Sequence, residues 1–251
     1  MRIGFIGAGN MASALARGLG EPAVVSDVDR ARAEALAAEI GGAAADSNAA
    51  AAAQSDAVIL CHKPPQLGAV ADEIRDEAKV VVSILGGVPL AAVEEAYPDR
   101  PVYRFMPSIP IEVRQGALCY SAGTRAADGP EDEIRELFAR AGTVIDLPEH
   151  LIDAATAVMS CSTAFYALVV EALVDGGVAH GLTADVAATM AVESMAGTAA
   201  VLREHGHDTR DLRRRVTSPG GMTARGLAAL ERGGVRAAFE DAVSAVVEGQ
   251  R

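Results

Sequence analysis

A glycine-rich turn follows the first apolar run of the chain. The residues Gly7-Ala8-Gly9-Asn10-Met11-Ala12 come directly after Arg2–Ile6 and match a GxGxxA version of the dinucleotide-binding fingerprint. In this pattern Gly7 permits the tight turn, Gly9 lets a pyrophosphate approach the backbone, and Ala12 lets the following helix pack close to the strand. The first amide groups of that helix are free to meet phosphate charge. The spacing therefore predicts a dinucleotide site formed by Gly7, Gly9, Asn10, Met11 and Ala12.

The end of the second apolar run offers groups that could contact the ribose of such a cofactor. Asp27 lies about 20 residues after the glycines, where an acidic side chain usually binds the ribose 2′-hydroxyl of NADH. Ser26 and Arg30 could instead receive the 2′-phosphate of NADPH. A third interpretation is that Asp27 or Asp29 merely caps the next helix. The residue types leave NADH and NADPH both open.

Strand-like and helix-like segments alternate over the first 150 residues, which predicts an α/β domain with a parallel sheet covered on both faces. The expected strands are Arg2–Ile6, Ala23–Ser26, Ala57–Cys61, Val80–Ile84, Val102–Phe105, Ala117–Tyr120 and Val144–Asp146. The expected helices are Asn10–Leu19, Asp29–Ile40, Pro65–Ile74, Leu90–Tyr97 and Glu131–Ala141.

From Leu151 onward we expect only helices, over Asp153–Val178, Ala184–Glu204, Thr223–Arg232 and Gly234–Glu248. We therefore predict a Rossmann-type doubly wound domain over residues 1–148 and an all-helical domain over residues 149–251. These helices carry more apolar surface than one small bundle buries, which favours a dimer formed through this half. A helix buried on all sides is the competing interpretation.

The composition argues against several classes of partner. The formal net charge of −12 repels nucleic acid and anionic membranes, and no run of about 18 apolar residues is evident, so we expect neither partner. The three cysteines, Cys61, Cys119 and Cys161, are spaced neither as a disulfide framework nor as a zinc site. His205 and His207 resemble a ligand pair, but a solvated helix end is the simpler interpretation. We expect a cytoplasmic protein without a metal.

Three later segments make the prediction more specific. His62-Lys63-Pro64 and Arg104-Phe105-Met106-Pro107-Ser108 each follow or end an expected strand, and Ser218-Pro219-Gly220-Gly221-Met222-Thr223 lies in the helical half. Together with the glycine turn, these segments resemble the pyrroline-5-carboxylate reductase family. The resemblance covers nearly the whole chain, and the SPGG-x-T segment is its most specific part.

This resemblance implies a function and an assembly. It implies an NADH- or NADPH-dependent oxidoreductase that reduces the C=N bond of 1-pyrroline-5-carboxylate to L-proline, the last step of proline biosynthesis. It also implies a Rossmann domain followed by a helical dimerisation domain, and an active site completed across a homodimer or larger homo-oligomer. The alternatives are a related imine or β-hydroxyacid reductase with a different substrate, and a non-catalytic nucleotide-binding homologue.

The resemblance also suggests roles for particular residues. The amides of Gly220 and Gly221, with Ser218, would bind the substrate carboxylate, and the Thr223 hydroxyl would face the ring nitrogen as the catalytic contact. An ordinary helix N-cap is the competing interpretation of this segment. The remaining candidates are Ser160 and Ser162 toward the substrate, and Lys63, Pro64, Met106, Pro107 and Ser108 toward the cofactor.

A protonated iminium is already electrophilic, so no strong general acid is needed and none is evident. Several positions depart from the family pattern. Ser108 replaces the usual asparagine, and Ser160–Tyr166 lacks a glycine and a proline and has the larger Phe165. These departures lie in segments expected near the substrate, so they bear on its identity more than on the type of reaction.

Overall fold

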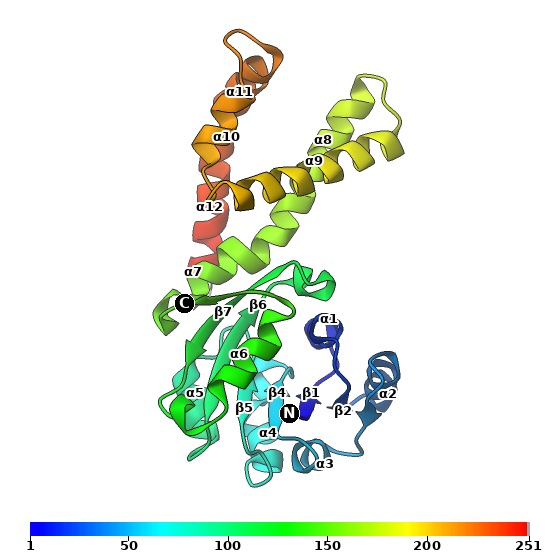
Figure 1. The fold of residues 1–251 in the computed structure, drawn as a ribbon, viewed down its shortest axis with the longest axis vertical. Helices are drawn as coiled ribbons and strands as arrows, with labels where there is room; N and C mark the ends of the chain where they lie inside the picture. Colours follow the sequence, from blue (N-terminus) through cyan, green and yellow to red (C-terminus); the bar gives the residue numbers. More distant parts are fainter. Residues whose placement is uncertain (250–251) are drawn as a thin grey trace. The chain divides into compact units, whose positions relative to one another are not determined.

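The computed structural model describes residues 1–249, which divide into two compact units, Met1–Thr163 and Ala164–Gly249. The first unit is built on one eight-stranded sheet with the order β3-β2-β1-β4-β5-β6-β7-β8 (Figure 1). The strands are β1 Ile3–Ile6, β2 Ala23–Ser26, β3 Ala43–Ala44, β4 Ala57–Leu60, β5 Val81–Ser83, β6 Val102–Pro107, β7 Gly116–Ala122 and β8 Gly142–Asp146.

The chain order reverses beside β1, which has β2 on one side and β4 on the other. In open parallel sheets such a reversal leaves a crevice at the carboxyl ends of the two central strands, where ligands bind. The turn after β1 and the segment after β4 therefore meet at one edge of the sheet.

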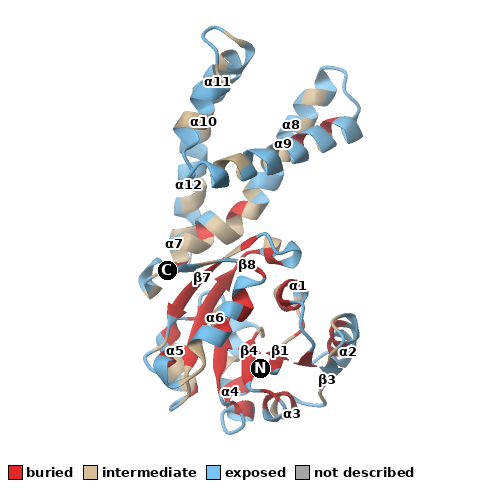
Figure 2. Cartoon of the chain, in the orientation of Figure 1, coloured by how far each residue is buried: buried red, intermediate tan, exposed pale blue. Residues whose placement is uncertain are grey.

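Both faces of this sheet are covered, because successive strand side chains alternate between two apolar clusters. One cluster holds Phe5, Ile59 and Val82 together with α1 Asn10–Leu19, α2 Arg30–Glu39 and α6 Glu131–Ala139. The other holds Ile6, Leu60 and Val81 together with α3 Asn48–Ala53, α4 Leu67–Ile74 and α5 Leu90–Ala96. Figure 2 shows the strands as the buried centre of the unit.

The sheet differs from the all-parallel expectation at one end. β7 runs antiparallel to β6, while β8 is parallel to β7. The connection from β6 to β7 is a short 3₁₀ turn, Ile109–Val113, which is too short for the crossover that parallel neighbours require. The two-residue strand β3 and the short helix α3 were also not predicted, because Ala-rich segments this short carry little periodicity.

The end of the first unit is tied to the sheet by a charged pair. Arg104, which is buried on β6, forms an ion pair with Glu149, and the same carboxylate accepts a hydrogen bond from the Leu90 amide at 2.8 Å. Beyond Glu149 the chain is helical but not uniformly so. Between α7 Ile152–Ala155 and α8 Ser162–Ala179, residues Thr156–Cys161 form a π-helical segment. The expected single helix over Asp153–Val178 is therefore interrupted, and such π segments are frequent at functional sites.

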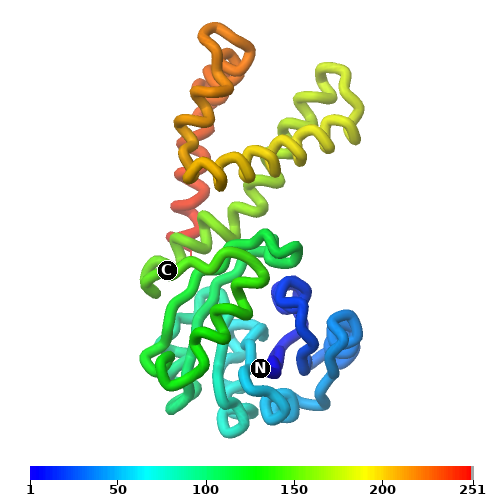
Figure 3. The backbone as a smooth tube through the Cα atoms, in the orientation of Figure 1, coloured from blue at the N-terminus to red at the C-terminus, as the bar shows by residue number. Residues whose placement is uncertain are grey.

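The second unit consists of helices only, among the residues that are described. After α8 it contains α9 Ala184–Glu204, α10 Thr209–Arg215, α11 Met222–Arg232 and α12 Val235–Glu248. Figure 3 shows the chain reversing between α8 and α9, and α11 leads directly into α12, with only Gly233 and Gly234 between them. Helix α10 was not predicted; Asp208 caps it by accepting hydrogen bonds from the Arg210 and Asp211 amides.

The helices of the second unit have almost no interior within this single chain. Among residues 164–249, only Ala187 and Ala191 are buried, whereas large apolar side chains are exposed, including Leu168, Leu173, Met190 and Val192. One helical stretch, Glu149–Ala179, is also long and apolar enough to cross a membrane, since an 18-residue window within it has a mean hydropathy of 1.8. The expectation that no such stretch exists was wrong. An apolar helix at a protein interface can have the same length and composition as a membrane-spanning helix.

Candidate functional site

The turn between β1 and α1 has the geometry that the glycine pattern predicts. Gly7 has a φ of +107°, and its amide donates to the Ser26 carbonyl at 2.8 Å. A Cβ on Gly7 would come within 2.8 Å of the Cys61 backbone at the end of β4. Gly7 is therefore required both by its conformation and by the close approach of two strands.

Gly9 is different, because nothing in the protein would meet a Cβ there within 4 Å. Gly9 precedes the first residue of α1, and no side chain caps that helix. The first amides of α1, those of Asn10, Met11 and Ala12, therefore point out of the helix end without an intrahelical acceptor. The open space in front of Gly9 and these amides suits an anion such as a phosphate.

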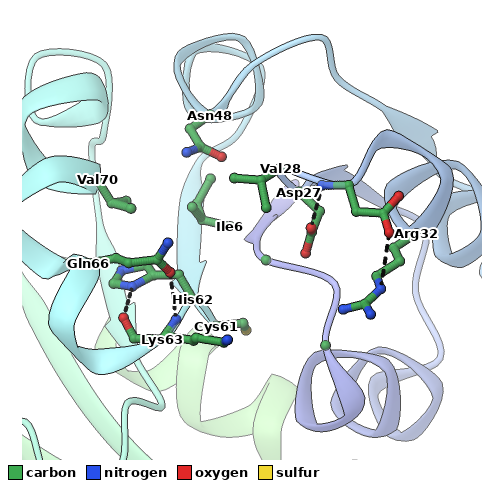
Figure 4. A pocket seen from close by; sticks show the side chains of 13 residues that line it. Ile6, Asp27, Val28, Arg32, Asn48, Cys61, His62, Lys63, Gln66 and Val70 are labelled. Carbon is green, nitrogen blue, oxygen red and sulfur yellow. Dashed lines mark hydrogen bonds and ion pairs between the residues drawn. The ribbon is translucent and has the colours of Figure 1, made fainter.

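A cavity of about 380 Å³ lies at this turn. Of the residues predicted to bind the cofactor, it brings together Gly7, Gly9, Asp27 and Lys63. In Figure 4 the segment after β2 forms one wall and the segment after β4 forms the other. Sequence reasoning missed the rest of the lining, which is Ile6, Val28, Asp29, Arg32, Asn48, Cys61, His62, Gln66 and Val70.

The wall after β2 holds Asp27 in place through backbone contacts. Its carboxylate accepts hydrogen bonds from the Ala8 amide at 2.6 Å and from the Asp29 amide at 2.8 Å. Asp29 in turn caps α2 by accepting from the Ala31 amide. The capping interpretation therefore holds for Asp29, while Asp27 links the glycine turn to the end of β2.

Ser26 and Asn48 lie behind this wall. The Ser26 hydroxyl is buried and donates to the Asn48 side-chain oxygen at 2.7 Å, and the Asn48 amide group donates to Glu73 at 2.7 Å. Asn48 begins α3, the short helix that the sequence analysis did not predict. Its place in the cavity could not be anticipated without that helix.

The wall after β4 is a compact loop. The Lys63 amide donates to the Gln66 side chain at 3.1 Å, and the His62 ring nitrogen Nδ1 contacts the Lys63 carbonyl at 3.0 Å. His62 Nε2 is buried without a hydrogen-bond partner. Burial lowers the pKa of His62 below its ordinary value and raises the pKa of the Cys61 thiol, so both side chains are neutral at pH 7. Pro64 is exposed and begins the short 3₁₀ turn of this loop.

The other predicted cofactor contacts have different surroundings. Asn10 lies in a neighbouring hollow beside α1 and α2, and Ala12 is buried in the core. Met106 packs against Cys119 and Ile152. Pro107 is buried, and the Ser108 hydroxyl contacts both the amide and the carbonyl of Ala117, at 3.1 Å each. In this structure Ser108 therefore joins β6 to β7.

The predicted substrate residues occupy two helical segments. Ser160 lies in the π-helical segment, and the hydroxyl of the buried residue Ser162 contacts the Met159 carbonyl at 3.4 Å. In the second unit, the chain turns at Ser218 and Gly220, where Gly220 has a φ of +69°. Gly221 precedes α11, which has no side-chain cap, and Thr223 is exposed in its first turn. The competing interpretation, a helix cap made by the Ser218 side chain, does not hold, because Gly221 is the N-cap residue and no side chain caps α11.

The role of Gly7 can be tested by stability. Gly7→Ala should lower the free energy of unfolding by about 2–4 kcal/mol, because it adds a backbone clash to a strained φ. Gly41→Ala is a matched control, since Gly41 has a φ of +69° but open space around its Cβ position. Urea unfolding should show the smaller loss, about 1 kcal/mol, for Gly41→Ala. If both variants lost the same free energy of unfolding, the close approach of Gly7 to the Cys61 backbone would have no effect on stability.

The doubly wound sheet and the cavity at its reversal point define a Rossmann-type dinucleotide-binding protein. Two family profiles match the chain: "NADP oxidoreductase coenzyme F420-dependent" over residues 2–87 and "Pyrroline-5-carboxylate reductase dimerisation" over residues 149–251. The chain belongs to the pyrroline-5-carboxylate reductase family, as near full-length relatives show.

The pyrroline-5-carboxylate reductase of Methanosarcina acetivorans is 37% identical, over 96% of this chain and 94% of the relative. That of Synechocystis is 34% identical, over 98% and 95%. Among solved structures, Plasmodium falciparum pyrroline carboxylate reductase with NADP bound has a TM-score of 0.89 at 25% identity, and the match covers 100% of this chain and 97% of that one.

Proposed function

We propose that this protein reduces the C=N bond of 1-pyrroline-5-carboxylate to form L-proline, with NADH or NADPH as the reductant. The observation that carries the proposal is the cavity at the glycine turn. The chain that forms it is similar, over nearly the full length, to relatives named pyrroline-5-carboxylate reductase. The nicotinamide cofactor supplies the hydride when it is bound.

The residues around the cavity fit such a cofactor. The open face of Gly9 and the amides of Asn10, Met11 and Ala12 would hold the pyrophosphate. Asp27 lines the cavity and would contact the adenosine ribose, and Lys63 lines it from the wall after β4, where it would contact the nicotinamide ribose. Pro64, Met106, Pro107 and Ser108 would shape the loops at the carboxyl ends of β4 and β6, and Ser26 would act through Asn48.

The segment Ser218–Thr223 would bind the substrate. The exposed N-terminus of α11 presents the amides of Gly220 and Gly221, which would hold the carboxylate together with Ser218. The Thr223 hydroxyl would hydrogen-bond the ring nitrogen and position it. We assign Ser160 and Ser162, in and beside the π-helical segment, to the same substrate.

The exposed apolar surface of the second unit supports a homo-oligomer. A second copy of the chain would cover side chains such as Leu168 and Leu173, which a single copy leaves in water. The same pairing accounts for the apolar stretch Glu149–Ala179 without a membrane. We propose a dinucleotide-binding domain over residues 1–148, a dimerisation and substrate domain over residues 149–251, and a cytoplasmic location.

The activity is tested by following NADH and NADPH oxidation with 1-pyrroline-5-carboxylate and with its six-membered ring analogue. We expect turnover of the five-membered ring and formation of proline. Turnover of the six-membered ring alone would assign the protein to the related reductases with a different substrate. Cofactor binding without turnover of either imine would contradict an enzymatic role.

A further inference from the structure

Ser26 and Arg30, which could have bound a 2′-phosphate, interact with other side chains in the structure. The Ser26 hydroxyl is buried and donates to Asn48. Arg30 does not line the cavity, and its guanidinium forms ion pairs with Glu34 at 2.7 Å and Asp46 at 2.5 Å. Neither side chain stands ready to neutralise a phosphate at the end of β2.

Asp27 remains as the group that faces the ribose position. It lines the cavity, and both its oxygens accept backbone hydrogen bonds, from Ala8 and Asp29. These contacts hold the carboxylate in place at the cavity wall. Each oxygen keeps a further lone pair with which to accept a hydrogen bond from a ribose hydroxyl.

The charges around this position are mostly negative. Arg32 is the cation that lines the same wall, and it pairs with Asp29 at 3.3 Å. The segment after β2 thus presents three carboxylates, Asp27, Asp29 and Glu34, against the guanidinium groups of Arg30 and Arg32. Asp46, which follows β3 and pairs with Arg30, adds a fourth carboxylate, and Lys63 lines the cavity from the opposite wall. A bound 2′-phosphate would add a charge of about −1.5 to −2 beside these carboxylates.

We infer that Asp27 is the cofactor-specificity residue of this protein and that it selects NADH over NADPH. The carboxylate accepts a hydrogen bond from the free 2′-hydroxyl of NADH and repels the 2′-phosphate of NADPH. This preference differs from the NADP seen in the Plasmodium falciparum structure. The inference rests on the dinucleotide binding proposed above, but not on the identity of the imine.

Calorimetric titration with NAD⁺ and NADP⁺ tests the inference without catalysis. We expect the wild-type chain to bind NAD⁺ about 10- to 100-fold more tightly than NADP⁺, because like charges oppose each other at a fixed distance. The shorter probes 5′-AMP and 2′,5′-ADP should show the same order, since they report on the ribose position alone. The value of kcat/KM should likewise be higher with NADH than with NADPH.

Asp27→Asn keeps the shape of the side chain and removes its charge, and Asp27→Ser also removes its bulk. Both should bring the NADP⁺ and NAD⁺ affinities to within about threefold of each other. Asp72→Asn is the control, because it removes the same charge from an exposed position on α4 that does not line the cavity. It should leave the ratio unchanged.

The outcomes separate this inference from the proposed function. Tighter or equal binding of NADP⁺ by the wild-type chain overturns the inference, as does an unchanged ratio in both Asp27 variants. Binding of neither nucleotide overturns the inference and the proposed function together. Preferential NAD⁺ binding without reduction of 1-pyrroline-5-carboxylate upholds the role of Asp27 and contradicts only the substrate.

Discussion

Gly9→Val should remove measurable dinucleotide binding and leave the chain folded. The backbone at Gly9 is extended, with φ −75° and ψ −177°, which valine adopts without strain, and no protein atom lies within 4 Å of its Cβ position. The new methyl groups would instead fill the space in front of the α1 amides, where the pyrophosphate must approach the backbone. We expect affinity for NAD⁺ to fall by at least about 100-fold.

Calorimetry and thermal unfolding together measure this effect. The free energy of unfolding should change by less than about 1 kcal/mol, the usual range for a residue that precedes a helix. Gly68→Val is a matched control, because Gly68 on α4 also has open space around its Cβ position but does not line the cavity. Affinity for NAD⁺ within about threefold of wild type in Gly9→Val would show that the pyrophosphate binds elsewhere.

Thr223→Ala should lower kcat/KM for the imine by roughly 100-fold, because loss of one hydrogen bond to the reacting group typically costs this much. Thr223 is exposed in the first turn of α11, so its hydroxyl is not needed to satisfy the protein interior. NAD⁺ binding and thermal stability should therefore stay close to those of the wild-type chain. Thr223→Ser, which keeps the hydroxyl, should recover most of the activity.

Steady-state kinetics with a purely structural threonine as control distinguish this role from a local change in helix stability. In α9, the Thr189 hydroxyl donates to the Asp185 carbonyl of its own helix at 2.9 Å. Thr189→Ala should leave kcat/KM unchanged. If Thr223→Ala turns over as fast as the wild type, then Thr223 makes no contact in the transition state, and the segment is an ordinary helix start.

The glycine turn shows how far sequence reasoning reaches in this chain. The residues of β1, α1 and β2 follow one another closely, and their bounds agree with expectation to within a residue. Local signals suffice here because the strand, the turn and the helix are specified by neighbouring residues. The resemblance to the reductase family was confirmed by the near full-length relatives.

Where prediction fell short, the deciding interactions are not local. The antiparallel direction of β7 depends on the short connection after β6, and the π-helical segment interrupts a run whose composition favours a continuous helix. Asn48 enters the cavity because α3 packs under the sheet beside β1 and β2. No periodicity in the run Asn48–Ala53 signals that position.

By itself, the sequence determined the class of fold, the glycine turn and the family of the protein, because each depends on residue types at fixed short spacings. Only the tertiary structure decided which polar groups near β2 are free to meet a ligand. Ser26, Asp27 and Arg30 stand within five residues of one another, yet one is buried, one faces the cavity and one is paired outside it. Those outcomes depend on partners at Asn48, Ala8 and Asp46, which folding brings together from distant parts of the chain.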